Sequence, residues 1–150
     1  MNKGFVYIAS DPEKSPSPFK FNSNKKLLNL EFEHSFLTLK KHHPNTPVTL
    51  FTNYDDLLDN KIGVDNVLKI NSDWGFIPKV DGLRQSPYGK TIFLDCDTQI
   101  NSSIDELFDL IEEYDLAICQ EYTNKNILNT GVLAVKGGSP FLNLWLGLLC

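Results

Sequence analysis

The sequence lacks the features of a disulfide-rich, zinc-binding or nucleic-acid-binding protein. Its three cysteines, Cys96, Cys119 and Cys150, are odd in number and show no CxxC spacing. This pattern argues against a disulfide framework or a zinc site, and it favours a reducing, cytoplasmic compartment. The basic residues form no cluster larger than Lys25–Lys26 and Lys40–Lys41, and the net charge is −5. We therefore expect no surface for nucleic acid or for an anionic membrane.

Segments that would lead the chain into a membrane are missing as well. The N-terminus, MNKGFVYIASD, has too few apolar residues for a signal peptide and is more typical of a first strand. No stretch predicts a membrane anchor, and no internal repeat is present. With 41% hydrophobic and 22% charged residues, the composition predicts one globular domain over residues 1–150.

The most informative stretch is KTIFLDCDTQI at 90–100, where an apolar run leads directly into two carboxylates. The β-branched and aromatic residues at 91–94 predict a buried strand. Because side chains alternate in extended chain, Asp95 and Asp97 should emerge on one side and Cys96 on the other. Hard oxygen ligands at this spacing suit Mg²⁺ or Mn²⁺, and substrate phosphates commonly complete the shell of such a metal.

The alternative to a metal site is a solvated strand end, or an Asx turn that closes onto Thr98. A chain with this many aspartates would contain about one Asp-x-Asp by chance. The position still favours a ligand site, because ligands bind at the carboxyl ends of strands in open α/β sheets. Two uncompensated carboxylates would also repel each other unless a cation or donors stood between them.

The remaining elements predict an α/β protein. Strands are expected at 4–10, 48–53, 64–70, 115–120 and 131–136. Helices are expected at 25–43, near 54–60, after Pro78, from 104 and at 141–149. Lys79 and Arg84 are candidate cations in the helix that precedes the acidic strand. The order predicts a three-layer α/β/α sandwich with a mostly parallel central sheet and the carboxylates at its carboxyl edge.

Local patterns predict how two of the helices begin and end. Ser103 and Glu106 form a capping box, so a helix is expected to begin at Ile104. His42 and His43 follow two lysines at the end of the helix at 25–43. Since a helix dipole favours positive charge there, we interpret both histidines as C-terminal charge rather than metal ligands.

Two segments depart from a simple globular pattern. Residues 11–24 contain three prolines and predict a loop, with Asn24 as the cap of the following helix. The helix at 141–149 is apolar almost all round and needs burial on several sides. This predicts a domain that is incomplete at its C-terminal end, or a homo-oligomer formed through that helix.

In this order, the elements resemble the nucleotide-diphospho-sugar transferases of the GT-A fold, especially glycosyltransferase family 8 and the glycogenin-like enzymes. The matching stretches cover most of the chain: VYIASD at 6–11, HSFLTLKKHHPNTPVTLFTN at 34–53, SPYGKTIFLDCDTQI at 86–100, ELFDLIEEYDLAI at 106–118 and NTGVLAVK at 129–136. The resemblance implies a metal-dependent glycosyltransferase with a Rossmann-like sheet.

The resemblance also implies a donor site, formed by Ala9, Ser10, Asp11, Lys79, Asp95 and Asn129. The first three would line the nucleotide pocket, and Asn129 would face the donor sugar. Asp95 and Asp97 would hold Mn²⁺ or Mg²⁺ on the diphosphate of the donor, for which a UDP-sugar is favoured. Lys79 matches the lysine that precedes the Asp-x-Asp strand and helps to hold the donor. The acceptor and the catalytic group are not identified.

The chain departs from the family pattern at three places. Asn53 stands where an acidic residue is common, and the segment from Pro12 to Asn22 carries no family motif. Related enzymes take a third metal ligand, often histidine, from a C-terminal segment, and this chain has no histidine after His43. The chain is therefore expected to correspond to the donor-binding part of such an enzyme.

Two other interpretations stay open. A haloacid-dehalogenase-type phosphatase also ends a strand in Asp-x-Asp, with the first aspartate as nucleophile. Its motif usually opens the domain, and it has Thr or Val where this chain has Gln99. A non-catalytic module that keeps the nucleotide pocket without turnover is the second alternative.

Overall fold

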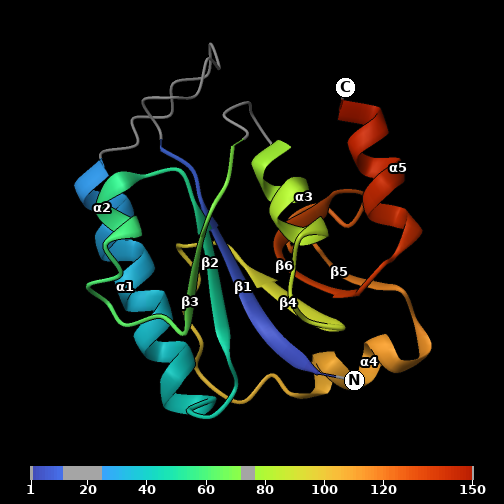
Figure 1. Cartoon of the computed structure of the whole chain (residues 1–150). Coiled ribbons are helices and arrows are strands. Elements are labelled where there is room, and N and C mark those ends of the chain that lie inside the picture. The colour runs from blue at the N-terminus through green and yellow to red at the C-terminus, as the bar shows by residue number, and fades with distance from the viewer. Residues whose placement is uncertain (1, 12–24, 72–76, 150) are drawn as a thin grey trace.

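The computed structural model describes residues 2–11, 25–71 and 77–149, and these form a six-stranded sheet between two layers of helices (Figure 1). The strands are β1 (Lys3–Ala9), β2 (Val48–Thr52), β3 (Asn66–Lys69), β4 (Lys90–Leu94), β5 (Leu116–Gln120) and β6 (Leu128–Lys136). The helices are α1 (Lys25–His42), α2 (Asp55–Leu58), α3 (Ile77–Arg84), α4 (Glu106–Glu113) and α5 (Pro140–Leu149). The proline-rich loop from Pro12 and the cap Asn24 lie outside the described residues.

The strand order is β3-β2-β1-β4-β6-β5. Strands β1 to β4 pair in parallel, whereas β6 pairs antiparallel with both β4 and β5. All five residues of β2 and all five of β4 are buried, as expected for strands covered on both faces. The mostly parallel sheet predicted from the sequence is therefore confirmed.

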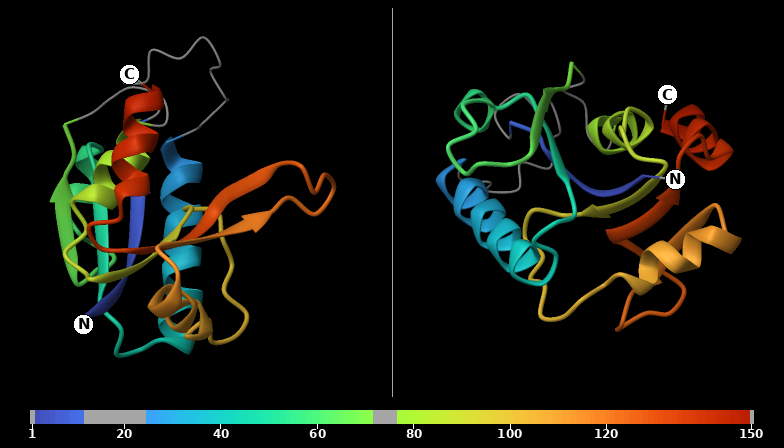
Figure 2. Two further views of the ribbon diagram at one scale, coloured as in Figure 1. Left: turned by 90° about the vertical axis from the view of Figure 1, so that its right-hand side faces the viewer. Right: turned by 60° about the horizontal axis from the view of Figure 1, so that its bottom comes forward.

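Alternate side chains of the strands feed two separate cores. On one face, Phe5 of β1 lies in a cluster with residues of α1 and α4, and its ring meets that of Phe108 edge-on at 5.4 Å. On the other face, Val6 lies in a cluster with Leu83 of α3 and Leu142 of α5. Figure 2 shows α1 and α4 on one side of the sheet and α3 and α5 on the other. The predicted three-layer sandwich is therefore confirmed.

The start of α4 differs from the prediction. The helix begins at Glu106, and its N-cap residue Asp105 makes no capping bond with its side chain. Ser103 Oγ accepts a hydrogen bond from the Asp105 amide at 3.3 Å, two residues on, rather than from the amide of Glu106. Tertiary contacts hold this segment outside the helix, because Lys3 pairs with Asp105 at 2.9 Å and the Ile104 amide donates to another side chain. The capping-box prediction is wrong.

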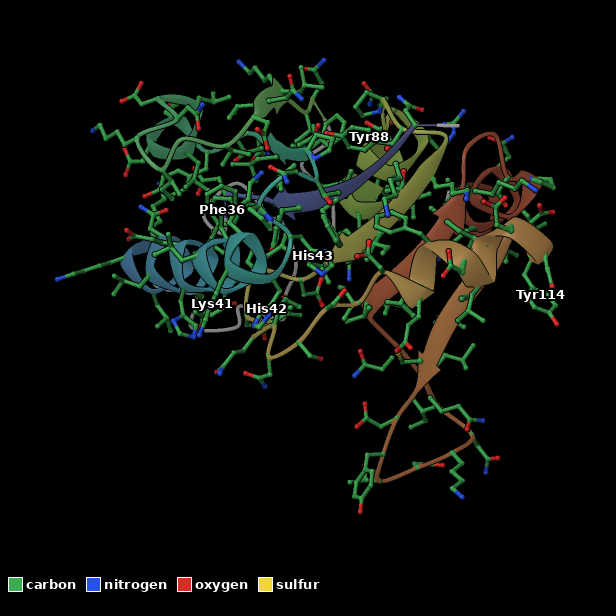
Figure 3. All side chains as sticks on the ribbon, turned by 90° about the horizontal axis from the view of Figure 1, so that it is seen from below. Phe36, Lys41, His42, His43, Tyr88 and Tyr114 are labelled. Atoms are coloured by element: carbon green, nitrogen blue, oxygen red, sulfur yellow. The ribbon has the colours of Figure 1, made fainter. Side chains whose placement is uncertain are left out.

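The prediction of positive charge at His43 is also wrong. This residue follows α1, its side chain is 1% exposed, and its ring packs edge-on against Phe5 at 4.9 Å. Its Nε2 accepts a hydrogen bond from the Ile104 amide at 3.1 Å, so this nitrogen carries no proton. Burial lowers the pKa of His43, and the opposing effect of the nearby Asp105 is smaller. His43 is therefore uncharged. Its hydrogen bond connects the end of α1 to the segment that leads into α4 (Figure 3).

The buried, uncharged His43 predicts that the stability of the protein depends on pH. Because the pKa of folded His43 lies below its unfolded value, the unfolded state binds more protons. The contribution of His43 is full above the unfolded pKa of about 6.5 and is lost as the pH falls through it towards the folded pKa. We expect the free energy of unfolding, measured by urea titration, to fall less steeply below about pH 6.5 in His43→Gln than in the wild type. Equal slopes would contradict this assignment.

Helix α5 meets only part of its predicted need for burial. Leu142 is buried against the sheet, and the rings of Phe141 and Trp145 contact each other at 5.6 Å. Leu144 and Leu148 face outwards with 64% and 78% of their surface exposed. A homo-oligomer through α5 stays a prediction that these two leucines support.

Candidate functional site

The acidic pair stands at the carboxyl edge of the sheet, directly after β4. Cys96 lies between the two aspartates and is buried, with its Sγ 3.8 Å from the carbonyl oxygen of Ile8 in β1. The side chain of Asp95 is 37% exposed, and Asp97 is exposed. Cys96 is therefore buried while the two carboxylates lie at the surface next to the end of β1, although Cys96 and Asp97 belong to a turn rather than to the extended chain expected from the sequence.

A tight turn follows the strand, but it does not use the carboxylate of Asp95. The amide of Thr98 donates to the main-chain oxygen of Asp95 at 3.1 Å, and the Thr98 hydroxyl donates to the same oxygen at 2.8 Å. The alternative of an Asx turn would have required the side-chain oxygen of Asp95. The turn thus fixes the backbone and leaves the carboxylate for another partner.

That partner is Lys79 of α3. Its Nζ lies 2.9 Å from Oδ1 of Asp95 and 3.3 Å from both the main-chain oxygen and Oγ1 of Thr130. The same nitrogen stands 4.7 Å from the ring centroid of Phe93, and the Lys79 side chain is only 13% exposed. A cation held in this way offsets the repulsion between Asp95 and Asp97. The sequence predicted Lys79 as a cation of this site.

The start of β6 forms the next part of the site. Asn129 Oδ1 accepts a hydrogen bond from the amide of Gly131 at 2.8 Å, and its Nδ2 donates to Glu121 at 2.8 Å. A Cβ added at Gly131 would lie 3.0 Å from Asn129 Oδ1 and 3.3 Å from Oδ2 of Asp95. The glycine therefore leaves room beside the second oxygen of Asp95, and the close backbone approach at this position is why a glycine fits it.

An open pocket of about 460 Å³ lies between the acidic turn and the hairpin of β5 and β6. The hairpin projects from the body of the molecule (Figure 2). The lining residues are Asp95, Asp97, Thr98, Cys119, Gln120, Glu121, Tyr122, Asn129, Gly131 and Val132. Its volume lies within the range of roughly 300–1,000 Å³ that is common for small-molecule sites. The sequence did not indicate Cys119, Gln120 and Tyr122 as site residues, because the first two belong to the strand expected at 115–120 and Tyr122 to a polar connection at 121–126.

Ala9 ends β1, and Ser10 and Asp11 follow it beside the acidic turn, but none of the three lines this pocket. Asp11 is buried, and its carboxylate lies 3.3 Å from Nζ of Lys25. Its amide donates to Oδ1 of Asn53 at 2.6 Å. Asn53 therefore ties the end of β2 to the end of β1. A role of Ala9, Ser10 and Asp11 in nucleotide binding stays a prediction.

The carboxylate oxygens of this site suit a hard divalent cation, although the protein supplies few of the ligands that such a cation needs. Asp97 is exposed, and Asp95 keeps Oδ2 beside the space left by Gly131 while Lys79 takes Oδ1. Within the part of the chain that the structure describes, no group of three or more His, Cys, Asp or Glu side chains could hold a metal ion. A metal on the two aspartates would need phosphate and water oxygens to complete its shell.

No family model matches the sequence, and no curated protein matches it either. Solved structures do match in three dimensions. The glycosyltransferase GlyE of Streptococcus pneumoniae superimposes with a TM-score of 0.69 at 17% identity, over 99% of this chain and 38% of GlyE. The galactosyltransferase LgtC, in complex with donor and acceptor sugar analogues, gives 0.56 at 13% identity over 96% of this chain and 59% of LgtC. The chain has the fold of these glycosyltransferases.

A protein of Desulfovibrio desulfuricans described as a nucleotide-diphospho-sugar transferase matches as well, with a TM-score of 0.59 and 8% identity. The match covers 91% of this chain and 64% of that protein. The fold predicted from the sequence is thereby confirmed, and the chain spans less than two thirds of each of these three structures. Among the described helices, none combines the length and apolar character needed to cross a bilayer.

Proposed function

We propose that this chain binds a nucleotide-diphospho-sugar together with Mn²⁺ or Mg²⁺, as the donor-binding part of a glycosyltransferase. The observation that carries the proposal is the pocket beside Asp95 and Asp97, with Lys79 paired to Asp95, in a fold shared with glycosyltransferases. A UDP-sugar is the favoured donor, because the sequence resembles family 8 and glycogenin-like enzymes.

The charges of the site explain why a cation is needed. Asp95 and Asp97 together carry two negative charges and Lys79 carries one positive charge, so the cluster alone would repel a diphosphate. A divalent metal bound there would neutralise charge on the departing nucleoside diphosphate. Lys79 does not line the pocket, but Thr130 and Asp95 hold it behind the acidic turn, where its positive charge can attract a phosphate group.

Asn129 is the residue of this site best placed to orient a sugar. Its side-chain amide is fixed at both ends, by the amide of Gly131 and by the carboxylate of Glu121. A polar group held in this way presents its remaining hydrogen-bonding capacity in one direction, which favours recognition of sugar hydroxyls. A cytoplasmic location is also proposed, and the free thiols of Cys96 and Cys119 support it.

A panel of nucleotide sugars, titrated by calorimetry with and without Mn²⁺, tests the proposal. We expect at least one donor, UDP-glucose first, to bind with Mn²⁺ and to lose most of its affinity when the metal is removed. Equal donor affinity with and without Mn²⁺ would contradict the proposal that a metal ion links the two aspartates to the diphosphate. Phosphate release from a phosphomonoester would favour the phosphatase alternative, and donor binding without loss of the sugar to any acceptor or water would favour the non-catalytic module.

A further inference from the structure

A chain of three hydroxyl groups runs from the core to the acidic turn. The Tyr7 hydroxyl lies 2.8 Å from Oγ of Ser35, and this Oγ lies 2.9 Å from Oγ1 of Thr98. The Thr98 hydroxyl ends the chain on the main-chain oxygen of Asp95 at 2.8 Å. Tyr7 and Ser35 are both 0% exposed. Strand β1, helix α1 and the turn after β4 are thus linked through buried hydrogen bonds.

The direction of this chain is fixed by its last member. The carbonyl oxygen of Asp95 can only accept, so the Thr98 hydroxyl must donate to it. Thr98 must then accept from Ser35, and Ser35 must accept from Tyr7. Burial raises the pKa of Tyr7 well above its usual value, so its hydroxyl stays a donor throughout the physiological range. All three hydroxyls polarise one another in the same sense, which strengthens each bond.

Helix α1 holds the same turn at a second point. The amide of Ile100 donates to Oγ1 of Thr38 at 3.2 Å, and the Thr38 hydroxyl donates to the carbonyl oxygen of Ser35 at 2.9 Å. Ser35 and Thr38 lie about one helical turn apart, on the side of α1 that faces this loop. Residues 95–100 are therefore fastened to α1 through two hydroxyl groups.

We propose that Tyr7 and Ser35 are positioning residues, which hold the Asp95–Asp97 turn in the geometry that binds the metal and the diphosphate. This inference rests on the proposed function. Neither residue lines the pocket, so the hydroxyl group of each acts through Thr98. A turn fixed before binding loses little entropy when the cation and phosphates arrive, whereas a loosened turn must be ordered at that moment.

The test compares Tyr7→Phe with Tyr88→Phe in the full 150-residue chain. Tyr88 is a matched control, because its hydroxyl lies 2.8 Å from Oγ1 of the buried Thr49 in the core on the other face of the sheet. Both variants remove one phenol hydroxyl from a buried pair and should lower stability similarly. Only Tyr7→Phe should weaken the binding of UDP in the presence of Mn²⁺, by roughly threefold to tenfold. Ser35→Ala should weaken it at least as much, and equal affinities of the two tyrosine variants would overturn the inference.

Amide hydrogen exchange supplies a readout that needs no ligand. In Tyr7→Phe and Ser35→Ala, the amides of Thr98 and Ile100 should exchange faster relative to the rest of the sheet, and in Tyr88→Phe they should not. Unchanged exchange at these two amides would overturn the inference even if affinity fell. If the wild type bound neither UDP nor any other nucleotide of the donor panel with Mn²⁺, the proposed function would fail, while exchange would still decide whether the hydroxyl chain holds the turn.

Discussion

Replacing Asp97 by Asn should reduce Mn²⁺-dependent binding of UDP-glucose by roughly 10- to 100-fold and leave the fold intact. Asp97 is exposed, so the variant removes a negative ligand without opening the core. The measurement is calorimetric titration of UDP-glucose, and of other donors if that one is silent, into the wild type and the variant with Mn²⁺ present. If the wild type binds measurably and the variant binds with the same affinity, Asp97 does not hold a metal ion on the diphosphate.

Asp95→Asn is the companion of this variant. It should weaken binding as well, and it should also lower stability, because Lys79 would keep its contacts with Thr130 but lose its negatively charged partner in a site where it is only 13% exposed. Which of the two variants has the larger effect distinguishes a metal-dependent transferase from a phosphatase. A phosphatase would use Asp95 as its nucleophile, so Asp95→Asn would abolish turnover while Asp97→Asn would have the smaller effect.

Replacing Lys79 by Met should raise the affinity for Mn²⁺ and lower the affinity for the nucleotide. The variant raises the negative charge of the cluster by one unit, so Mn²⁺ alone should bind several times more tightly. Nucleotide affinity measured at saturating Mn²⁺ should fall by roughly tenfold, because a charge-assisted hydrogen bond to phosphate is lost. Methionine keeps a similar length and can cover the ring of Phe93. Titrations of Mn²⁺ alone and of UDP at saturating Mn²⁺ measure the two effects.

Lys3→Met is the matched control for this experiment. Lys3 also forms an ion pair of 2.9 Å, with Asp105, and its Nζ stands 4.8 Å from the ring centroid of Phe108. It lies at the start of β1, at the edge of the sheet opposite to the acidic turn. Both affinities should stay at wild-type values in Lys3→Met. Parallel losses of Mn²⁺ and nucleotide affinity in Lys79→Met would contradict a direct role of Lys79 in holding the nucleotide.

Much of the fold could be predicted because its signals are local. The apolar runs of β1, β2 and β4 are buried on both faces, so they stand out in the sequence as strands of a parallel sheet. The sequence did not predict the early part of β6, because Leu128 and Asn129 pair with β5 in an exposed hairpin and the residues at 128–130 have no apolar pattern. The position of β6 between β4 and β5 also depends on pairing between distant segments.

The candidate site follows the same division. Asp95 and Asp97, which line the pocket, directly follow a predicted strand, and Lys79 lies in the helix that leads into β4, whereas Asn129 was indicated only by the family resemblance. The hydroxyl chain could not be predicted, because its members are separated by 28 and 63 residues and each alone looks like an ordinary core or turn residue. The buried His43 belongs to the same class, since its amide partner is 61 residues away.

Because β6 runs antiparallel to β4, one end of it forms a wall of the pocket and the other end pairs with β4 inside the sheet. Its later residues pair with β4, from Leu94↔Val132 to Lys90↔Lys136, whereas its first residues lie beyond the sheet core in the hairpin. The turn at 121–127 is largely exposed, so insertions there can reshape one wall of the pocket without shifting the register that holds Asp95. The shape of this pocket can therefore change by exchange of the hairpin tip, while the acidic turn and the strands behind it stay unchanged.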